Sequence, residues 1–513
     1  MNGAASLVKT LLGGGLTTCF ANPGTSEMHF VAALDEHPEL RCILCLFEGG
    51  TSGAADGYNR MSDAVAATLL HLAPGFGNAL ANVHNALKAN SGMLNVVGDH
   101  ADYHLRFDSP LKGDVAGVTG TVSHWVRTAD DARSVAADGA AALRAARTMN
   151  GQIATLILPA NTAWEDADGP AEVSPPPALQ RPSSEAIEAA AKALSQPGAA
   201  LLLGSRAPYG ETAELAGQIA AKTGCRLLAD FLMRRMERGL DAVAMDRLRY
   251  VVDDNVGFLN GTTNLVLVGG TRPVSFFAYP GKPSTPEPAD CALWELCGPG
   301  MDIRWTLEAL ADELGAGTAQ AARVAGAVPE VPSGSMELEK IGQAIAALMP
   351  ENAIIVDESV TVGRAIAPAF SSAPRHDLLS TTGGAIGQGL PVATGAAVAC
   401  PDRKVIALTG DGSAMYTVQS LWTMAREELD VTVIVFANRG YQILRGELAN
   451  VGVETVGRNA VRMLDVDDPL LDWVALARGH GVPAMRVEDT DGFVAALRRS
   501  LGVSGPALIE VVC

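Results

Sequence analysis

Cysteine is scarce in this sequence of 513 residues. The eight cysteines stand at positions 19, 42, 45, 225, 291, 297, 400 and 513, which is neither dense nor regular enough for a disulfide scaffold. Cys42 and Cys45 have the spacing of a zinc-binding pair, but they lie in an expected strand, where residues three apart point to opposite faces. We therefore expect reduced cysteines in a protein whose fold depends on its core.

Long apolar runs and basic blocks are also missing. No stretch reaches the roughly 18 consecutive apolar residues that a membrane-spanning helix needs, and the first residues lack the basic start of a signal peptide. The 38 Lys and Arg against 57 Asp and Glu give a net charge of −19, which disfavours nucleic acid and anionic membranes as partners. We expect a cytoplasmic globular protein.

Short apolar strands, such as 405–408, alternate along the chain with alanine-rich amphipathic helices. This rhythm predicts an α/β fold with parallel sheets. Stretches rich in Pro and Ser at 172–184 and 328–335 are typical of linkers. Because the length also favours about three domains, we predict three doubly wound parallel-sheet α/β domains, at 1–165, 183–327 and 336–513.

Two oxygen-bearing side chains follow neighbouring predicted strands in the last block. Asp411 ends one apolar strand and Asn438, 27 residues later, ends the next. A carboxylate and an amide oxygen are ligands that suit Mg²⁺. Gly410 and Gly412 let the chain turn tightly and bring backbone N–H groups to phosphate oxygens at the start of a helix. The spacing therefore predicts a site for a metal and a diphosphate.

This segment resembles the cofactor motif of thiamine diphosphate-dependent decarboxylases and acetolactate synthases, in which a GDG is followed at a distance by Asn-Asn. Ala437 stands where the first Asn is expected, whereas Asn438 is retained. The resemblance implies that Mg²⁺ is held by Asp411, Asn438 and the carbonyl of Gly440. It also implies that the diphosphate side of the cofactor binds at Gly410, Asp411, Gly412, Ser413 and Asn438.

A second motif lies near the N-terminus, where Glu48 precedes two glycines and a small-residue helix. The segment 44–58 resembles the strand and helix of the same family that carry the cofactor-activating glutamate. The resemblance implies that Glu48 is catalytic, because a carboxyl that hydrogen-bonds the aminopyrimidine promotes proton removal from the thiazolium carbon. A lone Glu here would otherwise be read as a helix N-terminal charge, but its pairing with the distant metal motif favours catalysis.

Two further segments resemble cofactor loops of the family. In 382–391, Ile386 matches the apolar wedge between the two cofactor rings, and the carbonyl of Gly384 is implied as an acceptor for the aminopyrimidine. After the strand that ends near 355, Ser359 and Thr361 are candidate hydroxyl donors to the diphosphate. These two residues could instead cap the helix that follows.

The substrate side of the expected site rests on two residues. Thr25 follows an Asn-Pro-Gly turn and matches a substrate-contacting Ser of benzoylformate decarboxylases, and His71 matches their catalytic His. An imidazole that titrates near neutral pH suits proton relay. Those decarboxylases also carry a His in the middle domain, whereas this chain has Phe276 and Phe277 in that region. The resemblance to them is therefore incomplete, and a structural role for His71 stays open.

The resemblance covers essentially the whole chain and implies a role for each predicted domain. Residues 1–165 would bind the pyrimidine, 183–327 would form a middle domain, and 336–513 would bind the diphosphate and Mg²⁺. In this family the first and last domains of different subunits face each other, which implies a homodimer or homotetramer with active sites at the subunit interface. Since 183–327 contains no RFDDR-like string, we expect no FAD.

The function implied is thiamine diphosphate- and Mg-dependent decarboxylation of a 2-oxo acid, with carboligation of the product to a second carbonyl compound, as in acetolactate synthases. Two alternatives remain: a non-ligating decarboxylase similar to benzoylformate decarboxylase, and a catalytically silent regulatory paralogue. A nicotinamide dehydrogenase is disfavoured, because no GxGxxG opens a helix after the first strand.

Overall fold

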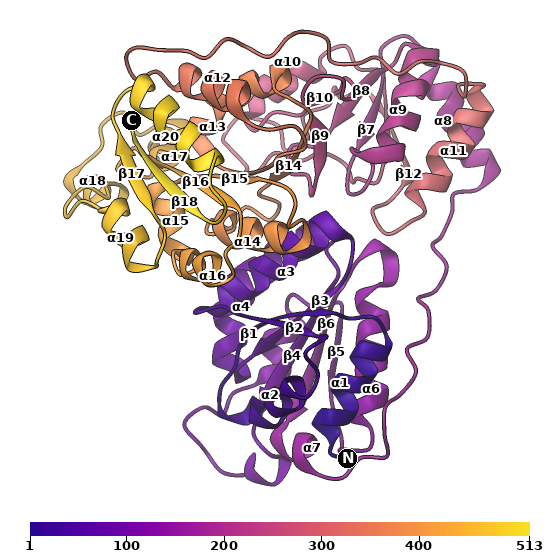
Figure 1. Cartoon of the computed structure of the whole chain (residues 1–513). Coiled ribbons are helices and arrows are strands. Elements are labelled where there is room, and N and C mark those ends of the chain that lie inside the picture. Colours follow the sequence, from indigo (N-terminus) through magenta and orange to yellow (C-terminus); the bar gives the residue numbers. More distant parts are fainter.

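Three β-sheets organise the chain in the computed structural model, which describes residues 1–513 (Figure 1). The first is a six-stranded parallel sheet in the order β2-β1-β3-β4-β6-β5. Its central strands are buried along their whole length, as expected when helices cover both faces of a parallel sheet. The strands are β1 (Thr18–Asn22), β2 (Arg41–Leu44), β3 (Ala66–Leu70), β4 (Met93–Asp99), β5 (Trp125–Thr128) and β6 (Ile153–Pro159). The helices of this region are α1 (Gly3–Gly13), α2 (Met28–Asp35), α3 (Glu48–Ser62), α4 (Leu72–Lys88), α5 (Val115–Gly120), α6 (Val135–Ala146) and α7 (Ala160–Trp164).

The second sheet is five-stranded and parallel, in the order β10-β8-β7-β11-β12. It has hydrophobic clusters of its own on its two faces. Its strands are β7 (Ala199–Leu203), β8 (Arg226–Ala229), β10 (Asp246–Arg247), β11 (Asn264–Val268) and β12 (Ala292–Cys297). Its helices are α8 (Ser184–Leu194), α9 (Gly210–Thr223), α10 (Val252–Leu259) and α11 (Ile303–Leu314).

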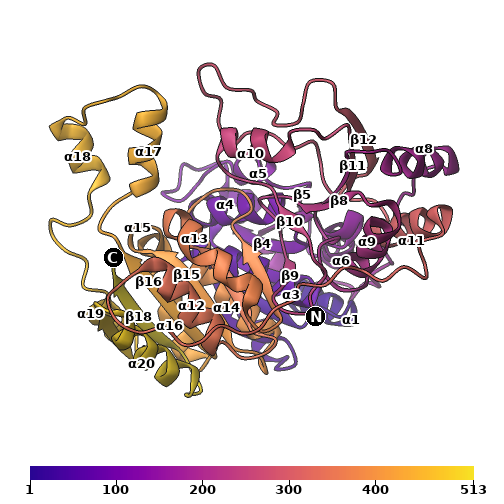
Figure 2. The same cartoon turned by 90° about the horizontal axis from the view of Figure 1, so that it is seen from above.

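The third sheet has seven strands in the order β17-β18-β16-β15-β13-β14-β9. Six come from the C-terminal part of the chain: β13 (Ile354–Glu358), β14 (His376–Ser380), β15 (Val405–Gly410), β16 (Val431–Ala437), β17 (Ala484–Val487) and β18 (Ala507–Val512). The helices here are α12 (Leu338–Leu348), α13 (Val360–Ile366), α14 (Gly389–Ala399), α15 (Asp411–Ala414), α16 (Ser420–Arg426), α17 (Gln442–Asn450), α18 (Arg458–Leu464), α19 (Trp473–Gly479) and α20 (Thr490–Leu501). Figure 2 shows α17 and α18 projecting from one side of the molecule.

The remaining strand of the third sheet, β9 (Met236–Arg238), comes from the middle of the chain and pairs antiparallel with β14. The adjacent Arg235 fixes this pairing, because its Nε donates to Asp377 Oδ1 at 2.6 Å. No apolar run marks this short strand in the sequence, so the strictly parallel pattern that we predicted is broken at this edge. The predicted fold class, with three α/β sheets, is confirmed.

The first and third sheets share one hydrophobic core of 41 buried residues, to which α3 and α14 both contribute. The two helices cross with backbones in direct contact. A Cβ at Gly57 would lie 2.1 Å from the carbonyl oxygen of Val392, and a Cβ at Gly395 would lie 1.8 Å from that of Ala54. Only glycine allows this approach, so the crossing fixes the two sheets against each other.

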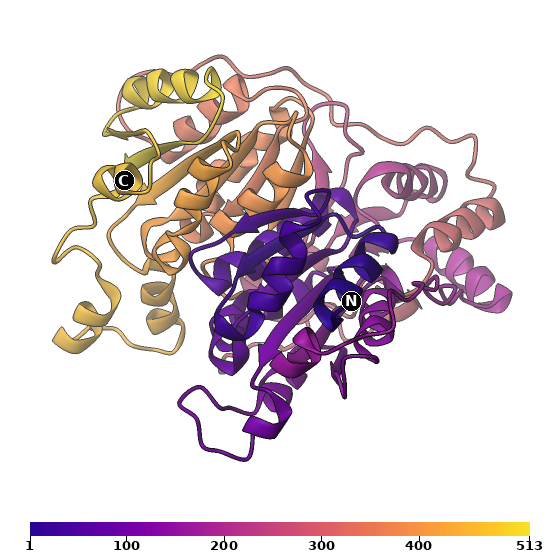
Figure 3. The same cartoon turned by 60° about the horizontal axis from the view of Figure 1, so that its bottom comes forward.

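Two long connections without helix or strand lie at 167–183 and 324–333, within or overlapping the predicted linkers. Figure 3 shows the second of them running along the outside of the molecule toward α12. The domain limits themselves stay a prediction. No helix is both long enough and apolar enough to cross a membrane.

Candidate active site

Asp411 and Asn438 lie at adjacent strand ends, because β15 and β16 are parallel neighbours with Gly410 opposite Phe436. Asp411 is 3% exposed, and its two carboxylate oxygens accept hydrogen bonds from the backbone N–H of Gly412 at 2.8 Å and of Arg439 at 2.7 Å. Burial raises the pKa of Asp411, and these two amides oppose that shift. A carboxylate, an amide oxygen and a nearby backbone carbonyl, that of Gly440, form an oxygen donor set that fits Mg²⁺.

The turn after β15 is tight because Tyr441 packs over it. A Cβ on Gly412 would come within 2.6 Å of the Tyr441 ring. Gly410, Gly412 and Ser413 surround Asp411 at the start of the short helix α15. The predicted diphosphate residues therefore stand at one carboxyl edge of the third sheet, where ligands of open α/β sheets bind.

The loop 382–388 carries Gly384 and Ile386. Gly384 has φ +80° and packs against the ring of Phe276, from which a Cβ would be 2.4 Å away. Asn85 of α4 holds the loop, donating to the Ala385 carbonyl at 2.9 Å and accepting from the Ala385 N–H at 3.2 Å. The loop that resembles the cofactor wedge is thus positioned by a helix of the first sheet.

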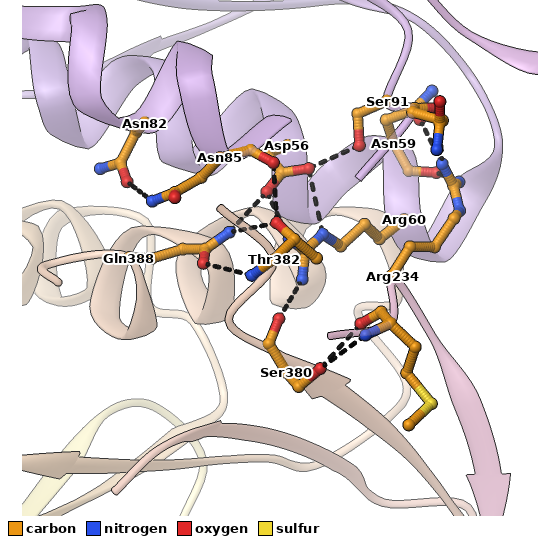
Figure 4. Close-up of polar contacts among 12 residues, drawn as sticks. Asp56, Asn59, Arg60, Asn82, Asn85, Ser91, Arg234, Ser380, Thr382 and Gln388 are labelled. Carbon is orange, nitrogen blue, oxygen red and sulfur yellow. Dashed lines mark hydrogen bonds and ion pairs between the residues drawn. The ribbon is translucent and has the colours of Figure 1, made fainter. Parts of the chain in front are cut away.

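A buried polar network fastens the same loop from the other side (Figure 4). Arg60 of α3 donates to Asp56 at 3.0 Å, to the Ser380 carbonyl at 2.8 Å and to the Thr382 hydroxyl at 2.7 Å. Gln388 donates to the other oxygen of Asp56 at 2.9 Å. We did not predict this network, because its members are polar residues of ordinary type scattered over the chain.

Ser359 and Thr361 flank Val360 after β13. Ser359 is buried and its hydroxyl donates to Asp357, while Thr361 lies in the first turn of α13. Val360 has φ +47°, a left-handed conformation that costs a β-branched residue energy and is found where a functional geometry demands it. The strained turn keeps this loop at the same edge of the sheet as Asp411.

Glu358, which ends β13, was missed by the sequence analysis. Its carboxylate is buried and accepts hydrogen bonds from the N–H groups of Gly387 and Gln388, both at 2.8 Å, and from the Thr409 hydroxyl at 3.1 Å. Burial raises the pKa of Glu358 to about 7, although these donors oppose the shift. Glu358 therefore connects the loop 382–388, here called the wedge loop, to β15, the strand that leads to Asp411.

Glu48 is the first residue of α3 and is half-buried. Its Oε2 accepts a hydrogen bond from Asn78 at 3.0 Å. Gly75 lies beside both Glu48 and His71, since a Cβ at Gly75 would be 3.2 Å from Glu48 Oε1 and 3.3 Å from His71 Cβ. The structure therefore brings the two predicted catalytic side chains together around one glycine.

His71 is paired with a buried carboxylate. Its Nδ1 lies 2.8 Å from Oε2 of Glu27, which is 1% exposed, and 3.3 Å from the Ser26 hydroxyl. Thr25, the predicted substrate contact, is exposed and belongs to the same 3-10 turn, Thr25–Glu27. The sequence analysis missed Glu27, whose only signal was its position three residues after Gly24, where it accepts from the Gly24 N–H at 2.7 Å.

A cavity of about 1120 Å³ opens between the second and third sheets. Gly384, Ile386 and Tyr441 line it, whereas Glu48, His71 and Asp411 do not. Within one chain Glu48 lies with His71 outside this cavity, whereas the wedge loop lines it together with Tyr441, which packs on the turn that carries Asp411.

Two protein-family models match the chain. The "Thiamine pyrophosphate enzyme, N-terminal TPP binding domain" matches residues 1–120, and the corresponding C-terminal domain matches 361–511. A Mycobacterium tuberculosis protein named "Putative acetolactate synthase large subunit IlvX" is 48% identical, over 100% of this chain and 99% of that protein. The benzoylformate decarboxylase of Pseudomonas aeruginosa is 28% identical over 97% of this chain and 96% of its own length.

Solved structures show the same fold. The thiamine diphosphate-dependent 4-hydroxybenzoylformate decarboxylase of Rhodococcus jostii RHA1 has a TM-score of 0.86 at 24% identity, covering 99% of this chain and 98% of the other. The benzoylformate decarboxylase of Polynucleobacter necessarius has a TM-score of 0.84 at 20% identity, covering 100% and 98%.

Proposed function

The chain belongs to the thiamine pyrophosphate enzyme family, and on this basis we propose that it uses thiamine diphosphate and Mg²⁺ to decarboxylate a 2-oxo acid and to join the product to a second carbonyl compound. Bound thiamine diphosphate supplies the electron sink for loss of carbon dioxide. Asp411, Asn438 and the Gly440 carbonyl hold the metal, and the turn at Gly410, Gly412 and Ser413 receives the diphosphate.

The observation that carries the proposal is the placement of Glu48. It begins α3 beside Gly75, with Asn78 bound to one of its oxygens, so its carboxylate is held in place at the head of a helix. With thiamine diphosphate bound, Glu48 would hydrogen-bond the aminopyrimidine nitrogen and would hold or move a proton there. The Gly384 carbonyl would accept from the cofactor's amino group, and Ile386 would supply an apolar contact to its rings.

His71 and Thr25 act on the substrate side. The Glu27 carboxylate lies 2.8 Å from Nδ1 of His71 and orients the ring, so the imidazole is positioned to exchange a proton with the product. Ser26 offers its hydroxyl next to that ring, and Thr25 precedes it in the same turn. Ser359 and Thr361, on either side of the strained turn at Val360, would donate hydroxyl hydrogen bonds to the diphosphate.

A complete site requires two subunits in this proposal. Glu48 does not line the cavity of its own chain, and the site would be completed when Glu48 of one protomer faces Asp411 and Asn438 of its partner. We therefore propose a homodimer or a homotetramer, and we expect a monomeric fraction to be inactive.

A non-ligating decarboxylase is the second candidate. The His71–Glu27 pair favours it, because a positioned proton donor releases the product as an aldehyde before a second carbonyl compound can react. The relatives named benzoylformate decarboxylase over nearly the whole chain support the same alternative.

The test is incubation of the purified protein with thiamine diphosphate, Mg²⁺ and a panel of 2-oxo acids from pyruvate to benzoylformate, with and without aldehyde acceptors. Carbon dioxide and organic products are measured together. Hydroxy ketones support the ligating enzyme, and aldehyde equimolar with carbon dioxide supports the second candidate. No carbon dioxide from any acid, with cofactor bound, would contradict both and favour the silent paralogue.

A further inference from the structure

The cavity between the second and third sheets continues away from the wedge loop into a region rich in arginine. At one end it is lined by Gly384 and Ile386. At the other end it is lined by the segment around β9 and β10, which Figure 1 shows near β14 and α13 at the junction of the two sheets. A group bound at the wedge loop could therefore extend into the second region within one cavity.

Five arginines line this cavity without a carboxylate partner: Arg226, Arg238, Arg247, Arg249 and Arg364. None of them forms an ion pair within 4.0 Å. Neighbouring arginines outside the cavity differ, since Arg235 is bound to Asp377 at 2.6 Å and Arg234 to Asp63 at 2.8 Å. The fold thus neutralises the arginines beside the cavity and leaves those inside it free.

Arg238 and Arg247 are half-buried and repel each other. Burial and the charge of Arg247 lower the pKa of Arg238 to about 10, and burial likewise lowers the pKa of Arg247. Both guanidinium groups stay charged at neutral pH, because arginine is not deprotonated in proteins. Two partly buried cations that repel each other and lack an ion-pair partner are costly, and an anion in the cavity would lower that cost.

The acidic residues that line the cavity form no ion pair with Arg238 or Arg247. Asp357 attracts both arginines, but its Oδ1 is engaged by the N–H and hydroxyl of Ser359. The Glu358 carboxylate points to the amides of the wedge loop. The remaining acids of the lining either are exposed or contact another group: Asp246, Asp254 and Glu447, the last of which accepts from Tyr250 at 3.4 Å.

Aromatic rings restrain all of these arginines except Arg238. The Arg247 guanidinium lies 5.4 Å from the centre of the Phe231 ring, and Arg364 lies 5.4 Å from that of Tyr250. Such stacking restrains the planar guanidinium while its N–H donors stay available for a carboxylate or phosphate. Phe276 and Phe277 add apolar wall between the arginines and the wedge loop.

We propose that the 2-oxo acid substrate carries a second anionic group at the far end of its side chain, and that Arg238 and Arg247 bind this group. The inference rests on the proposed function, because it places the reacting end of the substrate near Ile386. It assigns the substrate class as a dianionic 2-oxo acid rather than a simple aliphatic or aromatic one.

The test compares kcat/KM for carbon dioxide release from acids of equal chain length, 2-oxoglutarate against 2-oxopentanoate and 2-oxoadipate against 2-oxohexanoate. We expect at least a tenfold preference for one dianionic acid. Arg238→Met and Arg247→Met should each lower kcat/KM for that acid at least tenfold and change it less than threefold for the neutral partner. Arg304→Met, on the exposed face of α11 and outside the cavity, is the matched control and should leave the preference unchanged.

Equal or better use of the neutral acids, unaffected by either arginine variant, would overturn the proposal. Calorimetry then measures the binding of glutarate and of ADP, which distinguishes a substrate site from a nucleotide site. It also measures binding by variants that lose turnover. If Arg247→Met loses ADP binding while its substrate preference is unchanged, the arginines bind a separate nucleotide. That result would overturn the proposed substrate class. If no acid releases carbon dioxide, the proposed function fails, and glutarate binding that depends on Arg238 and Arg247 still identifies an anion site.

Discussion

Arg60 donates a hydrogen bond to the main-chain oxygen of Ser380, 320 positions later in the chain, at 2.8 Å. Both groups are buried, and Arg60 is 0% exposed. The contact links α3, which Glu48 begins, to the strand that leads into the wedge loop. The position of the loop that carries Ile386 therefore depends on a helix of another sheet.

Arg60→Met should destabilise the protein by about 3–5 kcal/mol, because it leaves the buried Asp56 carboxylate without its ion-pair partner. Urea titration of the free energy of unfolding measures the effect. The double variant Asp56→Asn/Arg60→Met should recover part of the loss, since the unpaired charge is gone. Arg304→Met is the surface control, expected within about 0.5 kcal/mol of wild type; an equally small effect of Arg60→Met would show that the network carries little stability.

Gly395→Ala should cost at least about 3 kcal/mol, because its Cβ would lie 1.8 Å from the Ala54 carbonyl oxygen and would force α14 away from α3. Gly446→Ala is the control: it lies in α17 with nothing within 4 Å of the added Cβ, so helix propensity should make it neutral or stabilising by up to about 1 kcal/mol. Thermal unfolding of both variants measures the difference, and Gly395→Ala should melt at the lower temperature. Similar melting temperatures would contradict a tight crossing of α3 and α14.

Glu358 should make stability depend on pH. Burial raises its pKa from 4.5 to about 7 in the folded protein, so the folded state binds the proton more tightly than the unfolded state. Its contribution to stability is therefore complete below pH 4.5 and is lost as the pH rises through about 7, by about 3 kcal/mol in total. The free energy of unfolding of wild type minus that of Glu358→Gln should fall across this range. A difference independent of pH would show that the carboxyl is not perturbed.

Carbon dioxide release should require Mg²⁺, and the concentration required should depend on Asn438. Removal of Mg²⁺ with EDTA should abolish carbon dioxide release, and Mg²⁺ should restore it. Asn438→Ala removes one of three proposed protein ligands, so we expect the Mg²⁺ concentration for half-maximal activity to rise at least tenfold. Asn450→Ala, in the exposed part of α17, is a matched control. An unchanged requirement in Asn438→Ala would place the metal elsewhere.

The elements that the sequence revealed are those whose signal is local. Asp411 and Asn438 could be placed together because each ends a long apolar strand and adjacent parallel strands end at one edge. Glu48 was identified because the segment 44–58 resembles the family's cofactor-activating segment, and it begins α3 in the structure. The fold class followed from the same alternation of strands and helices.

The rest depends on contacts between distant residues of ordinary type. The strand β9 contains Met, Glu and Arg, which carry no strand pattern, and its pairing with β14 is decided by tertiary contacts such as Arg235 with Asp377. Glu27 was missed because a glutamate in a polar turn gives no sign that it will be buried against His71. The arginine-lined cavity likewise forms only when the second and third sheets meet.

The most direct test of the account is the exchange of the C2 proton of bound thiamine diphosphate with deuterium from the solvent, followed by NMR after rapid quenching. It requires no knowledge of the substrate and reports on Glu48 alone when wild type is compared with Glu48→Gln at saturating cofactor and Mg²⁺. The account predicts exchange at least 100-fold slower in the variant, with cofactor affinity changed far less. Equal exchange rates in the two proteins would contradict the assignment of Glu48 and, with it, the proposed catalytic function.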